Sequence, residues 1–474
     1  MPQTLEIREP ALVNGRVVGS HPVFFGTRGQ DGKPYAPYGP LAAVLAVPHH
    51  LLGRMVAAIA DVPRTPLPGG IVWLIVVGGV TMLSTATAAA LAVAGFHRAA
   101  LALGTERRQA LVLSLLLGGA TVLWTYGVSL FSEAFQAAAF IWAAALLVES
   151  RRQLRGAGGK VALAATLIAI AGLTKVTSLV FAPAFVIAAL VEPSIGMRRR
   201  VKAAAVLAAG IAIATGIHLA WNGYRFGDLF NFGYDWSETV AQLPARAFMV
   251  GDIPRGLAVL LLAPGKSIVL WAPPLLLAAW NAPRFIRREP AVSLGALVAI
   301  VVGLLFFAAY QFPEGGYAHG PRNLVPIIPL VLLVAAGPGA GKWPRALVYA
   351  TAVLGFTVAL LSTSVSYLED QSLVAAPSAV LRTVYYERID APAGRPWNRY
   401  RLDYIPFAQT IMSPGWLTAP TLGLGPDYFP LHLLQARRQL PRGSAIPLWL
   451  VIGWPLAWVI LVIATIRNLV TRLR

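Results

Sequence analysis

Long apolar runs constrain this chain more than any other feature of its sequence. A bilayer core is crossed by about 20 apolar helical residues, and several runs here approach that length. Only 12% of the 474 residues are charged and 57% are hydrophobic, whereas soluble proteins carry about 25% charged residues. The sequence therefore predicts an all-α polytopic membrane protein with about 11 spans. These expected spans are residues 71–95, 110–127, 132–148, 161–174, 177–191, 203–221, 257–281, 291–310, 324–337, 346–364 and 446–466.

Six short loops between these spans are basic, and they alternate correctly along the chain. They are residues 96–109, 149–160, 192–202, 281–290, 337–345 and 467–474. Together they hold 19 Lys and Arg residues against four acids. Because basic loops stay on the cytoplasmic side, these six are predicted to face the cytoplasm of a plasma (inner) membrane. Most of the net charge of +19 therefore lies in a rim of basic loops that faces anionic lipid, and nucleic-acid binding is not expected.

The long polar segments then fall on the extracytoplasmic side. Residues 1–70 form a first loop, residues 71–364 a transmembrane core, residues 365–445 a small irregular subdomain, and residues 446–474 a last helix with a basic tail. Residues 41–60 are apolar, but counting them as a span would invert every basic loop. We expect a re-entrant or juxtamembrane helix there, in agreement with Pro48 near its middle.

Several kinds of chemistry are excluded by residues that the sequence lacks. There is no cysteine, so neither disulfides nor thiolate catalysis can occur. There is no P-loop, no GxGxxG and no HExxH pattern, which argues against ATP-driven transport by this chain. No cofactor is firmly implied, and the need for a divalent metal stays open.

The polar turn at residues 312–329 separates two apolar runs and carries Glu314, His319 and Arg322. Charged groups close to hydrocarbon are costly and are usually kept for function. Gly315, Gly316 and Gly320 are expected to let the backbone approach a ligand closely.

Arg322 follows Pro321, which is expected at the first position of a helix. A guanidinium beside free helix N–H groups would bind phosphate. The alternative is a snorkelling interfacial arginine. Since the segment from Leu324 onward is apolar, loss of Arg322 is expected to leave folding intact.

Two stretches of the first loop offer further candidates. Glu6 and Glu9 could act as a general base, or they could belong to a solvated terminus. The sequence DGKPYAPYGP at residues 31–40 predicts a rigid loop, in which Lys33, Tyr35 and Tyr38 could hold a phosphate or stack on a sugar. The alternative for that loop is a Pro-rich turn with interfacial tyrosines.

Polar residues also mark the outer ends of three expected spans. Glu133 opens a helix, where it would either favour the helix dipole or bind sugar hydroxyls. Lys175 lies at the tip of a shallow helical hairpin and would pair with a lipid phosphate or snorkel. Asn222, Tyr224 and Arg225 belong to an aromatic loop that suits either sugar binding or an interface belt.

Taken in order, these pieces resemble the GT-C superfamily of membrane glycosyltransferases, which includes protein mannosyltransferases and aminoarabinose transferases. The resemblance covers roughly residues 5–365. It is carried by DGKPYAPYGP at 31–40, LFSE at 130–133, AGLTK at 171–175, NGYRFG at 222–227, PGKSIVLWAPP at 264–274 and, most specifically, GPRNLVP at 320–326.

The resemblance implies a GT-C-like helical bundle and an inverting transferase. The donor would be a sugar on a polyprenyl phosphate, and the acceptor a hydroxyl of a glycan, lipid or protein outside the cytoplasm. An acid of the first external loop would be the base, with Glu6 first, Glu9 second and Asp31 third. Arg322 would hold the departing phosphate with help from Lys175 or Lys33.

One feature departs from the family pattern. Members usually begin with a span that delivers the catalytic acid, whereas this sequence begins in the external loop, which leaves the choice of base open. The competing hypotheses are a transporter or flippase of a lipid-linked sugar, and a non-catalytic scaffold. A transporter usually shows two matching halves or mid-membrane charges, neither of which is evident.

The charge alternation makes a topology prediction. Cysteines introduced at Gly158 and Gly394 should react with a membrane-impermeant reagent from opposite sides of the membrane, with Gly394 outside. Labelling of both positions from the same side would contradict the predicted orientation.

Overall fold

The computed structural model describes residues 7–13, 16–23, 27–35, 38–62, 64, 71–151, 156–233, 253–310, 313, 315, 318–337 and 343–364. The expected span at 446–466, the subdomain at 365–445 and the basic tail lie outside the described residues.

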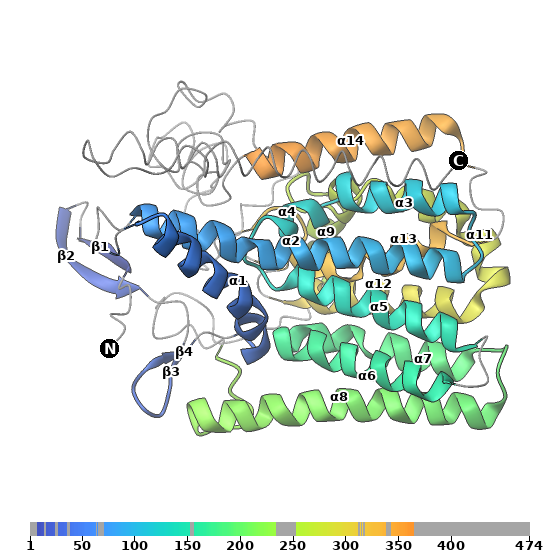
Figure 1. Cartoon of the computed structure of the whole chain (residues 1–474), viewed down its shortest axis with the longest axis horizontal. Coiled ribbons are helices and arrows are strands. Elements are labelled where there is room, and N and C mark those ends of the chain that lie inside the picture. Colours follow the sequence, from blue (N-terminus) through green and yellow to red (C-terminus); the bar gives the residue numbers. More distant parts are fainter. Residues whose placement is uncertain are drawn as a thin grey trace.

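Long helices run side by side and form the body of the molecule (Figure 1). Seven of the described helices are long and apolar enough to cross a membrane. They are α1 (Pro40–Ile59), α2 (Ile71–Ala102), α5 (Glu133–Arg151), α6 (Ala157–Thr174), α8 (Met197–Phe226), α12 (Pro290–Ala309) and α14 (Arg345–Ser364). The prediction of a multi-pass helical membrane protein is therefore confirmed in its coarse form.

Three of the predicted continuous spans are in fact broken, which corrects the expected helix pattern. The first becomes α3 (Arg107–Gly119) and α4 (Leu123–Gly127). The second becomes α9 (Ile253–Leu262), α10 (Ile268–Trp271) and α11 (Leu275–Arg288). The third becomes η3 (Arg322–Ile327), α13 (Ile328–Leu332) and η4 (Leu333–Ala335). In the second of these, Pro264 and Pro273 lie between the pieces and remove donors that a continuous helix needs.

The shallow hairpin predicted at 161–191 is present, with a short second arm. After α6 the chain forms η1 (Val176–Phe181) and then α7 (Pro183–Val191). Helix α1 lies obliquely at the end of the bundle where α5 begins (Figure 1). Its length would allow a crossing, so its placement in the interface stays a prediction.

Strands precede α1, so the all-α prediction is wrong in detail. β1 (Ile7–Val13) pairs antiparallel with β2 (Arg16–Val23), and β3 (Thr27–Arg28) pairs with β4 (Pro34–Tyr35). These strands lie within residues 1–70, which were predicted as the first extracytoplasmic loop. Its strand pattern is short and lacks a strong apolar alternation, which is why length-based span prediction missed it.

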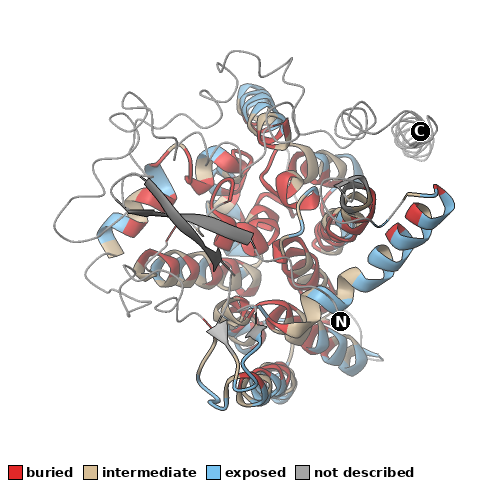
Figure 2. Cartoon of the chain, turned by 90° about the vertical axis from the view of Figure 1, so that its left-hand side faces the viewer, coloured by how far each residue is buried: buried red, intermediate tan, exposed pale blue. Residues whose placement is uncertain are grey.

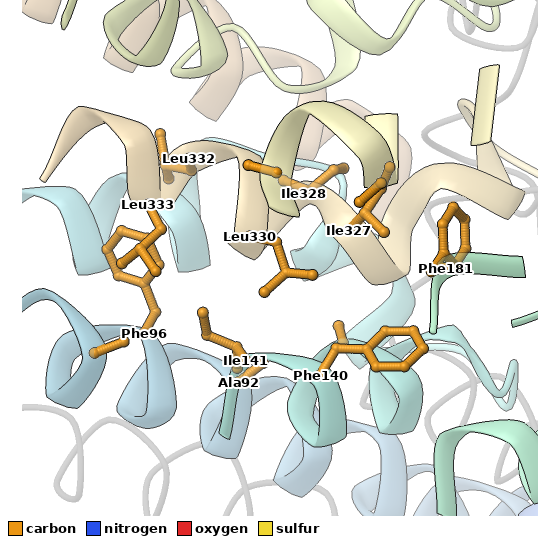
Figure 3. Close-up of a cluster of buried hydrophobic side chains, with 14 of the residues drawn as sticks. Ala92, Phe96, Phe140, Ile141, Phe181, Ile327, Ile328, Leu330, Leu332 and Leu333 are labelled. Atoms are coloured by element: carbon orange, nitrogen blue, oxygen red, sulfur yellow. The ribbon is translucent and has the colours of Figure 1, made fainter. Parts of the chain in front are cut away.

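The core lies where the broken segment η3–α13–η4 passes between the long helices. Its side chains pack toward α2, α5 and η1. Figure 3 shows this for Leu330 of the broken segment, Ile141 of α5 and Phe181 of η1. Viewed along the bundle, buried residues face the centre and exposed ones the outer faces of peripheral helices (Figure 2). Interrupted backbone at membrane depth is tolerated only when protein surrounds it, and this segment is almost entirely buried.

Ion pairs and one backbone contact join the basic loops at a single end of the bundle. Glu149 pairs with Arg98 and Lys160, and Arg151 pairs with Glu192 and Glu289. The Gly337 amide donates to Thr105 Oγ1 at 2.7 Å. Five of the six predicted loops therefore share one end, and the sixth lies outside the described residues. Which side of the membrane that end faces stays a prediction.

Helix packing makes a second prediction, from two helical glycines. A Cβ on Gly355 of α14 would lie 2.1 Å from the backbone oxygen of Ala120, whereas one on Gly216 of α8 would meet nothing within 4 Å. Gly355→Ala should lower the free energy of unfolding by about 1–3 kcal/mol. The matched control Gly216→Ala should raise it by about 0.8–1 kcal/mol. Thermal unfolding in detergent measures both, and a Gly355→Ala protein as stable as wild type would refute the contact.

Candidate functional site

A buried ion cluster joins three segments that are far apart in the sequence. Oε1 of Glu133 accepts hydrogen bonds from Lys175 Nζ at 3.0 Å and from Arg322 Nε at 2.8 Å. Lys175 Nζ also donates to Asn323 Oδ1 at 2.9 Å. Glu133 is completely buried, and Lys175 and Arg322 are only 7% and 8% exposed. We call these four residues the Glu133 cluster.

The cluster lies at the end of the bundle opposite the basic loops. Glu133 is the first residue of α5, and Arg151, which belongs to the basic end, is its last. The 18 rises between them correspond to about 27 Å at about 1.5 Å each. The protein therefore has two polar layers at opposite ends of α5. One contains the basic loops, and the other is the small, buried Glu133 cluster.

Local structure explains why each side chain arrives there. Glu133 begins a helix, where the dipole favours a negative charge, and Lys175 follows the last residue of α6, where it favours a positive one. Arg322 begins η3, and its guanidinium carbon lies 3.9 Å from the centre of the Phe131 ring. That cation–π contact fixes the plane of the guanidinium.

The predicted helix N-terminus at Arg322 needs correction. Pro321 is the N-cap of η3 rather than its first residue, and η3 is a six-residue 3-10 helix. The Arg322 amide already donates to the Gly320 carbonyl, and the Leu324 amide to that of Pro321. The cationic side chains, not free helix N–H groups, are what this turn offers to a ligand.

The charges of the Glu133 cluster do not balance. Two cations share one carboxylate, and among the described residues no second carboxylate pairs with either of them. Arg322 Nη1 and Nη2 donate to no described residue, and Oε2 of Glu133 accepts from none. The described cluster thus carries a surplus positive charge and two uncommitted donors in the fork geometry that phosphate oxygens match.

Neighbouring aromatic and basic residues hold the turn before Arg322 in place. Tyr126 donates to the His319 carbonyl at 3.0 Å, and the His319 ring stacks on Trp271 with centroids 6.0 Å apart. Lys266 donates to the Ala318 carbonyl. Sequence analysis missed Lys266 and Tyr126 as site residues, although a lone lysine in an apolar stretch is a signal.

The glycines of this turn permit close approach within the protein. A Cβ on Gly320, which has φ +64°, would lie 2.7 Å from the Trp271 ring, and one on Gly315, with φ +82°, 2.8 Å from Arg322 Cβ. Their described contacts are thus with protein atoms rather than with a ligand. Gly316 and Glu314 lie outside the described residues.

The first loop forms a separate, exposed cluster. Asp31 accepts from the Lys33 amide at 3.1 Å and from the Tyr35 hydroxyl at 3.0 Å, and Lys33 Nζ lies 3.1 Å from Asp31 Oδ2. These hydrogen bonds, that of the Lys33 amide first, hold the pKa of Asp31 below its usual value. Lys33 has a side chain 76% exposed and pairs with Asp31 rather than joining the Glu133 cluster.

Tyr38 lies just before the point where the first loop packs on the end of α6. A Cβ on the next residue, Gly39, would lie 2.1 Å from the Leu173 carbonyl, so the loop packs tightly on the last turn of α6. Lys175 follows two residues later.

The end of α8 holds Asn222, Tyr224 and Arg225 against the first loop. Arg225 Nη2 donates to Asn222 Oδ1 at 2.8 Å, and both residues are buried. The carbonyls of Tyr224 and Arg225 accept from Gln30. Asn222 and Arg225 thus stabilise this junction, whereas the Tyr224 side chain is 65% exposed.

The predicted base residues are the least described. Glu6 lies outside the described residues, and Glu9 belongs to β1, where its backbone is paired in register with that of His21. The structure therefore brings Glu133, Lys175 and Arg322 together and leaves Asp31 and Lys33 in the exposed cluster.

Comparisons with known proteins return one weak similarity. No family model matches the chain, and no curated protein matches it either. Among solved structures, ArnT from Cupriavidus metallidurans in the apo state is similar, with 17% sequence identity and a TM-score of 0.43. The match covers 75% of this chain and 58% of that chain. At this level of similarity the function has to be inferred from the residues of this chain.

The shared carboxylate makes a stability prediction. Glu133→Gln leaves Lys175 and Arg322 buried without a counter-charge and should lower the free energy of unfolding by about 3–5 kcal/mol. The double variant Glu133→Gln/Lys175→Met should recover part of that loss because it removes one of the two uncompensated cations.

The exposed acid Glu106 provides the matched control, since Glu106→Gln should change stability by less than about 0.5 kcal/mol. Thermal unfolding of the purified proteins in one detergent measures all three variants. A Glu133→Gln protein that melts with wild type would show that the two cations do not depend on this carboxylate.

Proposed function

We propose that the protein is a membrane glycosyltransferase that moves a sugar from a polyprenyl-phosphate donor to an extracytoplasmic acceptor hydroxyl. The observation that carries the proposal is the surplus positive charge that the described residues give the Glu133 cluster, buried at the end of the bundle away from the basic loops. A buried cation without a full counter-charge favours an anionic partner.

The depth of the cluster suits a lipid-linked anion. A polyprenyl tail lies in the bilayer, so its phosphate lies at the level where the membrane helices end. Glu133 and Lys175 occupy such helix ends, at the start of α5 and directly after α6. A nucleotide-sugar donor would instead require a polar nucleotide pocket, for which the sequence offers no phosphate-binding loop.

The chemistry follows from the charges. The acceptor oxygen attacks the anomeric carbon from the face opposite the phosphate, and the bond between that carbon and the phosphate oxygen breaks. The electron pair leaves with the phosphate, whose growing charge Arg322 and Lys175 would stabilise. Arg322 can meet two phosphate oxygens through its Nη atoms, which donate to no described residue, while Lys175 acts as a point charge.

The acceptor proton passes to a carboxylate in this proposal. We retain Glu6 as the first candidate and Glu9 as the second. Asp31 stays third because its hydrogen bonds from Lys33 and Tyr35 lower its pKa, which makes it a weaker base. Tyr38 and Tyr35 are proposed to face the sugar or the acceptor, together with Glu314, His319 and the α8 end at Tyr224. The contacts of Asn222 and Arg225 favour a supporting role there.

Arg322 provides the sharpest test. Arg322→Lys should reduce transfer from short-chain polyprenyl-phosphate hexoses and pentoses, and Arg322→Gln should reduce it about 10²–10³-fold. Loss of transition-state stabilisation is the reason, since the substituted side chains cannot pair with two oxygens. The assay is release of polyprenyl phosphate by purified protein in detergent, per mole of folded protein.

Normalising to folded protein matters because Arg322 is part of a buried ion cluster. Loss of Arg322 is no longer expected to leave folding intact, because Glu133 would lose one of its two partners. Exposed Arg108 provides the control, and Arg108→Gln should be fully active. Equal turnover of Arg322→Gln and wild type would remove Arg322 from the mechanism, and donor movement across vesicle membranes without sugar transfer would favour a flippase.

The base is tested separately. Glu6→Gln should reduce transfer about 10²–10⁴-fold with little loss of folded protein. Should Glu6→Gln be active while Glu9→Gln or Asp31→Asn is inactive, the base assignment changes and the mechanism stands. Full activity of all three variants would contradict proton transfer to a first-loop carboxylate.

A further inference from the structure

A pocket lies at the basic end of the bundle, between α5, α7, α8 and α12. It contains about 700 Å³ of empty space, including its open side. Its walls include Ala144, Leu147, Ala188, Ala203 and Gly295, and Leu333, a core residue labelled in Figure 3, also lines it. Nothing in the proposed transfer reaction uses it.

Small side chains create this space and make it apolar. Alanine and glycine on facing helices leave room that larger side chains would fill by interdigitation. Along α7 the wall extends from Ala184 to Glu192, which at about 1.5 Å per residue is about 12 Å. An apolar cavity of this kind is poorly hydrated and accepts hydrocarbon.

The mouth of the pocket is polar and holds an unmatched donor. Arg151 Nη1 pairs with Glu192 at 3.0 Å and with Glu289 at 2.7 Å. Its Nη2 is buried and has no hydrogen-bond acceptor among the described residues. A buried N–H without an acceptor is unfavourable, so an oxygen supplied by a bound molecule would stabilise it.

Two further arginines contact residues that line this pocket. Arg199 and Arg200 precede Ala203 by four and three residues, so all three share one face of α8. Arg199 Nη2 donates to the Ser150 carbonyl at 3.3 Å, and Arg200 Nε to that of Ile195 at 2.8 Å. Ser150 and Ile195 both line the pocket. Arg199 and Arg200 thus bring two more guanidinium groups next to residues of the pocket wall.

We propose that this pocket binds one anionic phospholipid from the leaflet on the side of the basic loops. One acyl chain would occupy the apolar cavity, and the phosphate would lie at Arg199 and Arg200, with an ester oxygen near Arg151. The apolar cavity matches the acyl chain of such a lipid, and the arginines at its mouth match the phosphate. The proposal is independent of the transferase function, and the site is remote from the Glu133 cluster.

The test is native mass spectrometry of the delipidated full-length protein, titrated with phosphatidylglycerol or with phosphatidylcholine carrying the same chains. A first phosphatidylglycerol adduct should form at about tenfold lower concentration than the phosphatidylcholine adduct. Ala188→Phe fills the cavity and should abolish that adduct. Ala209→Phe, on an exposed position of α8, is the matched control and should keep it.

The head group is tested with Arg199→Gln/Arg200→Gln, which should bind both lipids equally. Ala144→Leu is a second filling variant if Ala188→Phe does not give folded protein by gel filtration. Equal binding of the two lipids by wild type would overturn the proposal. So would a phosphatidylglycerol preference that persists in a folded variant with the cavity filled, because the lipid would then bind elsewhere.

Discussion

One carboxylate holds together the end of the molecule where the candidate site lies. Glu133 is completely buried, and a single oxygen of its side chain receives both Lys175 and Arg322. Burying a charge is unfavourable unless it is paired and hydrogen-bonded, so each of these groups needs the others. The start of α5, the end of α6 and the start of η3 are thereby fixed relative to one another. The packing of the central broken segment depends on that arrangement.

The same interaction connects stability with chemistry. A fully compensated cluster would hold the helices together but would have little affinity for an anion. Here the described residues leave Arg322 two uncommitted nitrogens and the cluster a surplus positive charge. The phosphate of a lipid-linked sugar would complete the charge balance on binding. Its departure as a leaving group would then be stabilised by side chains that are already in position, which is how preorganised sites lower a barrier.

The sequence predicted much of this fold, because apolar length and loop charge are local properties. The long helices α2, α5, α6, α8, α12 and α14 and the shared end of the basic loops followed from them. The resemblance placed Arg322 at one phosphate with Lys175 or Lys33, and Glu133 was a separate candidate. The pairing of both cations with Glu133 was not predicted, since Glu133 is separated from Lys175 and Arg322 by 42 and 189 residues and only packing brings them together. Lys33 lies in the exposed cluster instead, where its local partner Asp31 pairs with it. Breaks at prolines inside apolar runs escaped notice because hydrophobicity alone does not register them.

The central claim is that Lys175 and Arg322 bind the phosphate of a polyprenyl-linked donor. A cryo-electron microscopy structure of the full chain in a lipid nanodisc with a non-hydrolysable short-chain polyprenyl-phosphonate sugar would test it most directly. The account predicts phosphonate oxygens within hydrogen-bonding distance of Arg322 Nη1 or Nη2 and of Lys175 Nζ, with the tail directed into the bilayer. A phosphonate bound at Lys33 or at the basic-loop end, with the Glu133 cluster unchanged, would contradict it.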